Sequence, residues 1–161
     1  MANAEAGKYL NDNFIATYQK VGTFRINGGQ KQGGNVASYF CTPEGRVLHV
    51  LAGPVQADVL LREARWVVET AKLSILDSGK NDARQRLFWR KAHGERLQQE
   101  HHVDVAQLGR SKSRVHLNNT GKVHLLLATM SLPRLEQVYK LVFEKILNQK
   151  VSTAPVVQVG G

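Results

Sequence analysis

The stretch "NVASYFCTPEGRVLHVLAGP", residues 35–54, constrains the fold of this chain more than any other. Two runs rich in β-branched and aromatic residues flank the sequence Pro43-Glu44-Gly45. Pro43 fixes φ near the value that a turn requires at its second position, and Gly45 tolerates positive φ. Because Pro54 then ends the second run, the pattern predicts a β-hairpin over residues 35–53.

The remainder of the first half alternates helix and strand signals. Residues 2–13 are good helix formers, and residues 14–26, "FIATYQKVGTFRI", are typical of a half-covered strand. Residues 27–35 hold four glycines and no apolar side chain before Val36, which predicts a loop. Residues 56–76 predict an amphipathic helix that packs against the hairpin through Leu60, Ala64, Val67, Ala71 and Ile75.

The second half is predicted to be helical. A helix begins at Asp82, its expected cap, and runs to residue 102, with thin apolar content in Leu87, Phe88, Trp89, Ala92 and Leu97. Residues 122–130 fit either a buried strand or a short helix. A last helix over residues 135–147 is expected after Ser131 as cap and Pro133 in the first turn, followed by an extended tail at 150–161.

Length and charge suggest one domain with a basic appendage. A chain of 161 residues accommodates one core. Residues 79–116 carry nine Lys and Arg against four Asp and Glu, a net +5, whereas residues 1–78 carry eight against seven, a net +1. We therefore divide the chain into an α/β core, 1–78, and a basic helical extension, 79–161.

Location and membrane association follow from the apolar pattern. No apolar run approaches the ~20 residues that span a bilayer, and the N-terminus lacks the pattern of a signal peptide. The expectation is a soluble cytoplasmic protein that does not associate with a membrane.

The order of these elements resembles the thioredoxin-like proteins of bacteria over about residues 5–76. Two motifs carry the resemblance, a helix end of the form "LN.NF" and a hairpin of the form "F..P.G.v....G". The matching residues are Leu10, Asn11, Asn13, Phe14, Phe40, Pro43, Glu44, Gly45, Arg46, Val47 and Gly53. The resemblance implies an α/β fold class with a mixed thioredoxin-like sheet.

This chain departs from the redox-active members of that family. They carry CxxC at the start of the helix that here runs from Ala2, where this chain has no cysteine, and Val36 stands where they place a cis-proline. The resemblance thus implies a thioredoxin-like scaffold without dithiol chemistry. The single cysteine also excludes an intramolecular disulfide, a zinc ribbon and an iron-sulfur cluster built from this chain alone.

Cys41 admits two interpretations. It is either a redox-active or sensing thiol, which requires a lowered pKa and exposure, or a small apolar residue of the core. The neighbours Phe40 and Leu48 favour the core.

The pairing of the two hairpin strands disfavours a metal site formed by Cys41 and His49. If Glu44 and Gly45 form a two-residue loop, Cys41 pairs with Leu48 and Phe40 with His49, so Cys41 and His49 face opposite sides.

Three histidines lie within or at the end of the second long helix. His101 and His102 diverge by about 100° on a helix and are poorly placed to chelate one ion. They are expected to be solvated residues that interact with the helix dipole, and the alternative is metal binding or pH sensing. The third histidine, His93, lies eight residues before His101. The sequence predicts no metal site and no cofactor.

The same helix carries basic residues around aromatic ones. This pattern suits phosphate contacts and base stacking, and it equally suits a surface for a protein or an acidic partner. The candidate binding residues are Arg84, Arg86, Trp89, Arg90, Lys91 and Arg96.

No catalytic motif is recognisable, and the Gly-rich segment at 28–34 lacks the GK[ST] ending of a P-loop. We therefore expect a non-catalytic binding or assembly module that associates with a protein partner or with itself. An edge left open beside the predicted strand 14–26 is a further reason for self-association. The alternatives are a thiol redox protein or sensor acting through Cys41 and a nucleic-acid-binding module using residues 84–96.

Overall fold

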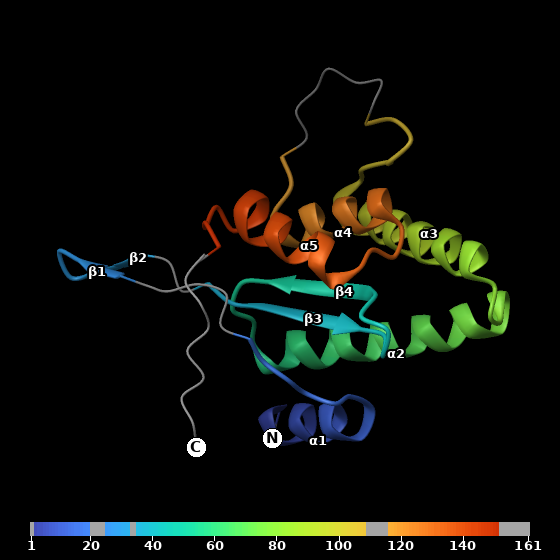
Figure 1. Ribbon diagram of the computed structural model, residues 1–161, viewed down its shortest axis with the longest axis horizontal. Coiled ribbons are helices and arrows are strands. Elements are labelled where there is room, and N and C mark those ends of the chain that lie inside the picture. Colours follow the sequence, from blue (N-terminus) through green and yellow to red (C-terminus); the bar gives the residue numbers. More distant parts are fainter. Residues whose placement is uncertain (1, 20–24, 33–34, 109–115, 152–161) are drawn as a thin grey trace.

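A computed structural model of the chain describes residues 2–19, 25–32, 35–108 and 116–151. The elements are α1 (Ala2–Asn13), β1 (Arg25–Asn27), β2 (Gln30–Gln32), β3 (Ala37–Cys41), β4 (Val47–Ala52), α2 (Ala57–Ser78), α3 (Asp82–His101), α4 (Asn119–Met130), α5 (Leu135–Leu141) and a π-helical turn, η1 (Val142–Ile146). The β3–β4 hairpin lies between α1 and α2 on one side and α4, α5 and η1 on the other, and α3 lies beside it (Figure 1).

The hairpin is confirmed, with one change of register. Phe40 pairs with His49 as predicted, but Cys41 pairs with Val47, so Leu48 is the extra residue of a bulge. The cause is the turn. Gly45 adopts a φ of 78°, and its N–H donates to the Thr42 carbonyl, which makes the loop one residue longer than the two-residue loop assumed above.

Each face of the hairpin is covered by a separate apolar cluster. Phe40 and Leu51 pack with Ala64 and Val67 of α2 and with Trp89 of α3. On the opposite face, the strands pack against α4, α5 and η1 through Val47, Val50, Val123, Leu127, Val138, Val142 and Ile146. Residues after 79 therefore supply one complete side of the core.

Two assignments in the first half differ from the sequence prediction. Of the expected strand 14–26, residues 14–19 have no regular secondary structure and residues 25 and 26 belong to β1, while residues 20–24 lie outside the described part. The expected loop 27–35 contains β2, which pairs with β1 across a tight turn. Gly28 and Gly29 make this turn at φ values of 58° and 80°, which glycine adopts at little cost.

The long helices are confirmed, but their faces and caps differ in detail. In α2 the predicted position Ile75 is 62% exposed, while polar Glu63, Thr70 and Ser74 are buried. The N-cap of α3 is Asn81, whose side chain accepts a hydrogen bond from the Arg84 N–H, rather than Asp82.

The ambiguous run 122–130 is helical, within α4, and Ser131 ends this helix instead of starting the next one. α5 begins after Arg134 and continues into η1, so the last predicted helix is present. Of the predicted tail, residues 152–161 lie outside the described part.

The described strands form two antiparallel pairs, β1 with β2 and β3 with β4. Along its other edge, β3 has no ladder partner among the residues that the structure describes. A mixed sheet needs a parallel pair, and none occurs among these strands, so the thioredoxin-like fold stays a prediction.

Candidate functional site

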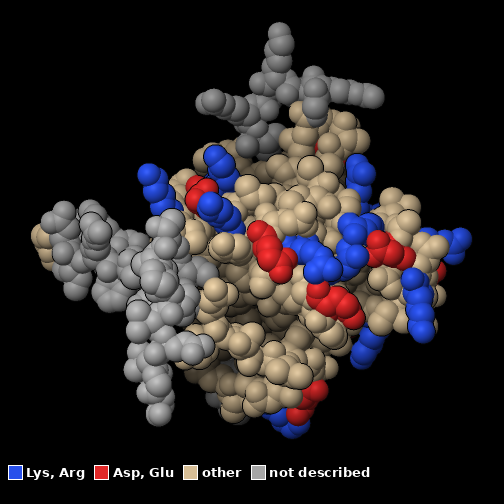
Figure 2. Space-filling view, in the orientation of Figure 1, with Lys and Arg blue, Asp and Glu red and all other residues tan. Residues whose placement is uncertain are grey.

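Most basic residues of α3 lie at its surface, whereas the side chain of Arg96 is 13% exposed. Arg84 and Arg90 are exposed, Arg86 Nε lies 2.8 Å from the Asp82 carboxylate, and Lys91 Nζ lies 3.7 Å from that of Glu95. Figure 2 shows the same mixing of signs over the visible face, where basic and acidic side chains lie interspersed. Neighbouring carboxylates therefore offset part of the positive charge on this face.

Trp89 and Arg96 face inward, which corrects their assignment as surface-binding residues. Trp89 is 3% exposed and packs in the core cluster with Phe40, so its ring is not available to stack on a base. Arg96 binds the carboxylates of Glu63 and Glu100. Trp89 and Arg96 are seven residues apart, so they lie on the same face of α3, and this face packs against the rest of the domain.

An exposed apolar surface lies where α2 ends and α3 begins. Leu73, Leu76 and Leu87 are 57%, 82% and 64% exposed. Leu87 also contributes to a hollow of about 400 Å³, which is lined by Asp77, Arg84, Leu87, Phe88, Lys91, Ala92 and Glu95. Leu73 lies one helical turn before Asp77 and therefore on the same side of α2 as this hollow. We refer to Leu73, Leu76, Leu87 and the lining residues as the α2–α3 patch.

The most unusual feature of the interior is a group of three buried histidines. His49 of β4, His93 of α3 and His124 of α4 are at most 1% exposed, and their ring centroids lie 5.1–5.8 Å apart. Trp66 packs edge-on against all three rings. We refer to the three residues as the histidine cluster.

Hydrogen bonds fix the position of His93. Its Nδ1 lies 2.9 Å from His124 Nδ1, and its Nε2 lies 2.9 Å from the Leu48 carbonyl oxygen. His49 Nε2 lies 3.2 Å from Glu63 Oε2, but the contact is poorly aligned, so neither nitrogen of His49 has a hydrogen-bond partner in the described residues. The same holds for His124 Nε2.

Burial keeps the cluster neutral. Desolvation lowers the pKa of His49 and of His124, and it lowers the pKa of His93 to about 3. The neighbouring Glu63 is ionised. Burial alone would raise the pKa of its carboxyl, but the close contact with His49 and the hydrogen bonds and charge of Arg96 hold this pKa well below the ordinary value. Three neutral imidazoles thus adjoin a charged network.

This network joins α2 to α3. Arg96 makes two hydrogen bonds to the Glu63 carboxylate and two to that of Glu100, and its guanidinium lies 4.6 Å from the centre of the Trp66 ring. Arg62 Nε lies 3.1 Å from Glu63 Oε1 at the surface. The buried Glu63 carboxylate is therefore compensated by two cations.

Cys41 lies half-buried in the cluster of apolar residues beneath α4 and α5. Desolvation, followed by the nearby Glu136 charge, raises the pKa of its thiol. A raised pKa lowers the thiolate fraction on which nucleophilic and redox chemistry depends.

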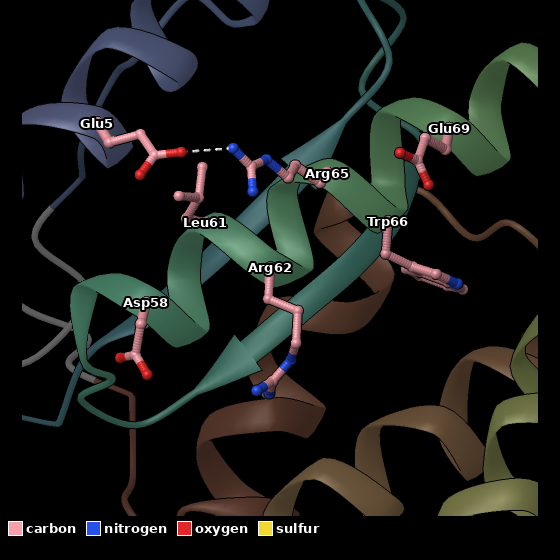
Figure 3. A pocket seen from close by; sticks show the side chains of 7 residues that line it. All are labelled: Glu5, Asp58, Leu61, Arg62, Arg65, Trp66 and Glu69. Carbon is pink, nitrogen blue, oxygen red and sulfur yellow. Dashed lines mark hydrogen bonds and ion pairs between the residues drawn. The ribbon is translucent and has the colours of Figure 1, made fainter. Parts of the chain in front are cut away.

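A second hollow opens on the outer side of α2, between α2 and α1. It has a volume of about 510 Å³ and is lined by Glu5, Asp58, Leu61, Arg62, Arg65, Trp66 and Glu69, as Figure 3 shows. Arg65 closes one side of it through an ion pair of 2.6 Å with Glu5. Trp66 connects this hollow to the histidine cluster, because its side chain lines the first and contacts the second.

Comparisons with protein-family models, curated proteins and solved structures found no match to this chain. Within the described ranges, none of the helices has the length and apolar character needed to cross a membrane.

The sequence analysis did not predict that the three histidines meet, although the residues around each of them indicate that it is buried. His49 and His124 are single polar residues within the apolar runs "VLHVLA" and "VHLLLA". His93 lies four residues after Trp89 and four before Leu97, both core residues of α3. Helical spacing therefore places His93 on the buried face, whereas His102 at the end of the helix is exposed.

Proposed function

We propose that this protein is a non-catalytic binding module that associates with a protein partner through the α2–α3 patch. The observation that carries the proposal is the exposure of Leu87, which lines the hollow, together with that of Leu73 and Leu76, which lie within one helical turn before the lining residue Asp77. Isolated exposed leucines are ordinary, but a group beside a hollow is typical of an interaction surface.

Charge complementarity indicates the kind of partner. The hollow is lined by Arg84 and Lys91 and also by Asp77 and Glu95, so its own charges balance. The excess of positive charge comes from exposed Arg90 on the same helix and from the whole chain, whose formal net charge is +9. A second copy would bring the same excess of positive charge to the contact. The patch therefore fits an amphipathic helix with an apolar face and acidic residues along its rim.

Other observations favour binding over chemistry. The Cys41 thiol has a raised pKa, which weighs against a redox role. Of the six candidate nucleic-acid contacts, Trp89 is buried and Arg96 is paired with two carboxylates. A cytoplasmic location is part of the proposal, since a chain with one thiol needs no oxidising compartment to fold.

A designed peptide tests the patch. The probe is a fluorescent Leu- and Glu-rich amphipathic helix, and its anisotropy is measured against the wild type, the variant Leu76→Glu/Leu87→Glu, and the control Ile75→Glu. Ile75 is as exposed as Leu87 but lies about 160° around α2 from Leu73. We expect the double variant to bind at least tenfold more weakly and the control to bind like the wild type.

Equal binding by all three proteins, or no binding by the wild type at low salt, would contradict the proposal. Light scattering during size-exclusion chromatography shows whether a second copy of the chain, rather than a different protein, occupies the patch. A dimer at tens of micromolar that is lost in the double variant would assign the patch to a second copy, whereas a dimer retained there would point to another surface, such as the open edge of β3.

A further inference from the structure

The histidine cluster has the composition and spacing of a metal site. One ring nitrogen from each of His49, His93 and His124 lies within 4.8 Å of the other two. The three side chains come from β4, α3 and α4, so the fold holds each nitrogen from a different direction. Convergence of three imidazoles from separate rigid elements is how proteins build preformed sites for transition metals.

The hydrogen bonds determine which nitrogen of His93 is available. The Leu48 carbonyl oxygen is an acceptor, so His93 Nε2 carries the proton and donates it. His93 Nδ1 then holds a lone pair, and in the metal-free protein the proton between the two Nδ1 atoms belongs to His124. A metal-binding histidine commonly donates its other N–H to a backbone carbonyl in this way.

Unpartnered ring nitrogens are a second and independent indication. His49 Nδ1 and Nε2 and His124 Nε2 are buried without a hydrogen-bond partner among the described residues. Each such atom costs roughly 1–3 kcal/mol of desolvation when it stays unsatisfied. An ion in the centre of the cluster that accepts the lone pair of His49 Nδ1 removes this cost for that nitrogen.

A small ion fits after two adjustments: the Nδ1 atoms of His93 and His124 separate slightly, and the more distant nitrogens, within 4.8 Å of one another, approach by up to roughly 1.5 Å. A tetrahedral ion with metal–nitrogen bonds of about 2.0–2.1 Å separates its ligand nitrogens by roughly 3.3 Å. His93 Nδ1 and His124 Nδ1 are 2.9 Å apart, so they need to separate by only a few tenths of an ångström. His124 would move its own proton from Nδ1 to Nε2, which frees the lone pair without releasing a proton to solvent.

We propose that His49, His93 and His124 bind one divalent transition metal ion of the zinc type within the core. Imidazole nitrogen is a ligand of Zn²⁺, Ni²⁺ and Cu²⁺ and a poor one for Ca²⁺ and Mg²⁺, which prefer oxygen. The three histidines leave one of the four tetrahedral positions for a water molecule, and the ion links β4 to α3 and α4.

Glu63 acts as the positioning residue of this site. Its carboxylate lies beside His49 Nε2, so a proton on Nε2 would face Glu63 and leave His49 Nδ1 for the ion. The charges of Glu63 and Glu100 are balanced by those of Arg62 and Arg96. Affinity must therefore come from the ligand bonds themselves, because the surrounding field does not attract a cation.

Trp66 offers a path to the buried site. Its ring contacts all three histidines on one side and lines the hollow of Figure 3 on the other. Rotation of this half-buried side chain would open the cluster to that hollow. Metal exchange is then expected to be slow, because it also requires the Arg96 guanidinium to leave the Trp66 face.

Titration of the full chain with Co²⁺ and Zn²⁺ after treatment with EDTA tests the site. One equivalent of Co²⁺ should give the visible absorption of a tetrahedral nitrogen-rich complex, and Zn²⁺ should displace it. Zn²⁺ should also raise Tm and shift the imidazole NMR resonances of the three cluster histidines while those of His102 and His116 stay unchanged.

Three variants complete the test. His124→Asn should abolish the Co²⁺ absorption, and Glu63→Gln should weaken Zn²⁺ binding by about 10–100-fold, as loss of an orienting partner does. His102→Asn is the matched control, since asparagine tolerates the φ of 55° at this helix end, and it should bind like the wild type.

The NMR experiment on the wild type decides the question even where a variant fails to fold. Zn²⁺ that shifts only the exposed histidines, or leaves Tm unchanged at one equivalent, would overturn the proposal. The same conclusion would follow if His124→Asn stayed folded and retained the Co²⁺ absorption. The cluster would then be a hydrogen-bonded core network that accommodates water.

Discussion

Lowering the pH from 7 to 5 is expected to destabilise the metal-free protein through its buried histidines. Burial holds the pKa of His93 near 3, whereas a histidine in the unfolded chain titrates near 6.5. Between these values the unfolded state binds a proton that the folded state does not. Stability is therefore complete above about pH 6.5 and declines as the pH falls toward 3.

The magnitude follows from this difference in pKa. For a histidine that stays neutral when folded, lowering the pH from 7 to 5 reduces the free energy of unfolding by about 2 kcal/mol. Burial shifts the pKa of His124 in the same direction, so the two histidines together contribute up to about 4 kcal/mol, and His49 changes the stability in the same direction. This is a large part of the 5–15 kcal/mol that is typical of a folded domain.

Other charged groups of the cluster titrate in a different window. Arg96 stays charged throughout this pH range. The carboxyl of Glu63 has a lowered pKa, so its contribution to the free energy of unfolding is lost only below about pH 4.3, where carboxyls of the unfolded chain bind protons. The change between pH 7 and 5 thus reports on the histidines.

Urea unfolding in EDTA, followed by circular dichroism at pH 7, 6 and 5, measures the effect. In His93→Gln, the decrease in the free energy of unfolding from pH 7 to pH 5 should be about 2 kcal/mol smaller than in the wild type, because glutamine does not titrate. This holds whatever the stability of the variant at pH 7. His116→Gln is the control, since His116 is exposed, and its pH dependence should equal that of the wild type. An unchanged stability from pH 7 to 5, or the same slope in His93→Gln, would refute the reasoning.

Two further predictions concern single buried groups. Glu63→Gln should destabilise the protein by about 3–5 kcal/mol at pH 7, since it leaves the Arg96 cation without its buried partner; Glu95→Gln, which removes only an exposed pair with Lys91, should cost less than about 1 kcal/mol in the same urea experiment. The Cys41 thiol should react slowly with a disulfide reagent in the native protein and rapidly in denaturant, because burial raises its pKa; fast reaction of the native protein would restore the redox hypothesis.

Local structure was largely predictable because its causes are local. Pro43 and Gly45 determine the hairpin turn, helical periodicity identifies α2, and the turn and cap signals before residue 82 locate the start of α3. Even here, the register beyond the turn depended on loop length. Because the loop has one more residue than predicted, Cys41 pairs with Val47 instead of Leu48. The bulge at Leu48 then restores the predicted pairing of Phe40 with His49.

The candidate sites were not predictable to the same degree. Trp89 and Arg96 belong to a basic stretch that is compatible with an exposed binding face, yet the first packs in the core and the second binds buried Glu63. The orientation of α3 decides this, and orientation depends on which elements pack around a helix rather than on the helix sequence alone.

The sequence by itself determined the hairpin, the number of long helices and the absence of any dithiol motif, since each depends on neighbouring residues or on residue counts. Only the tertiary structure brought His49, His93 and His124 together. Each stands alone within an apolar or helical run, and no local rule links residues that lie 31 or more positions apart. Burial of three polar rings is tolerable only where packing from several elements places their nitrogens near one another, and that is a property of the assembled fold.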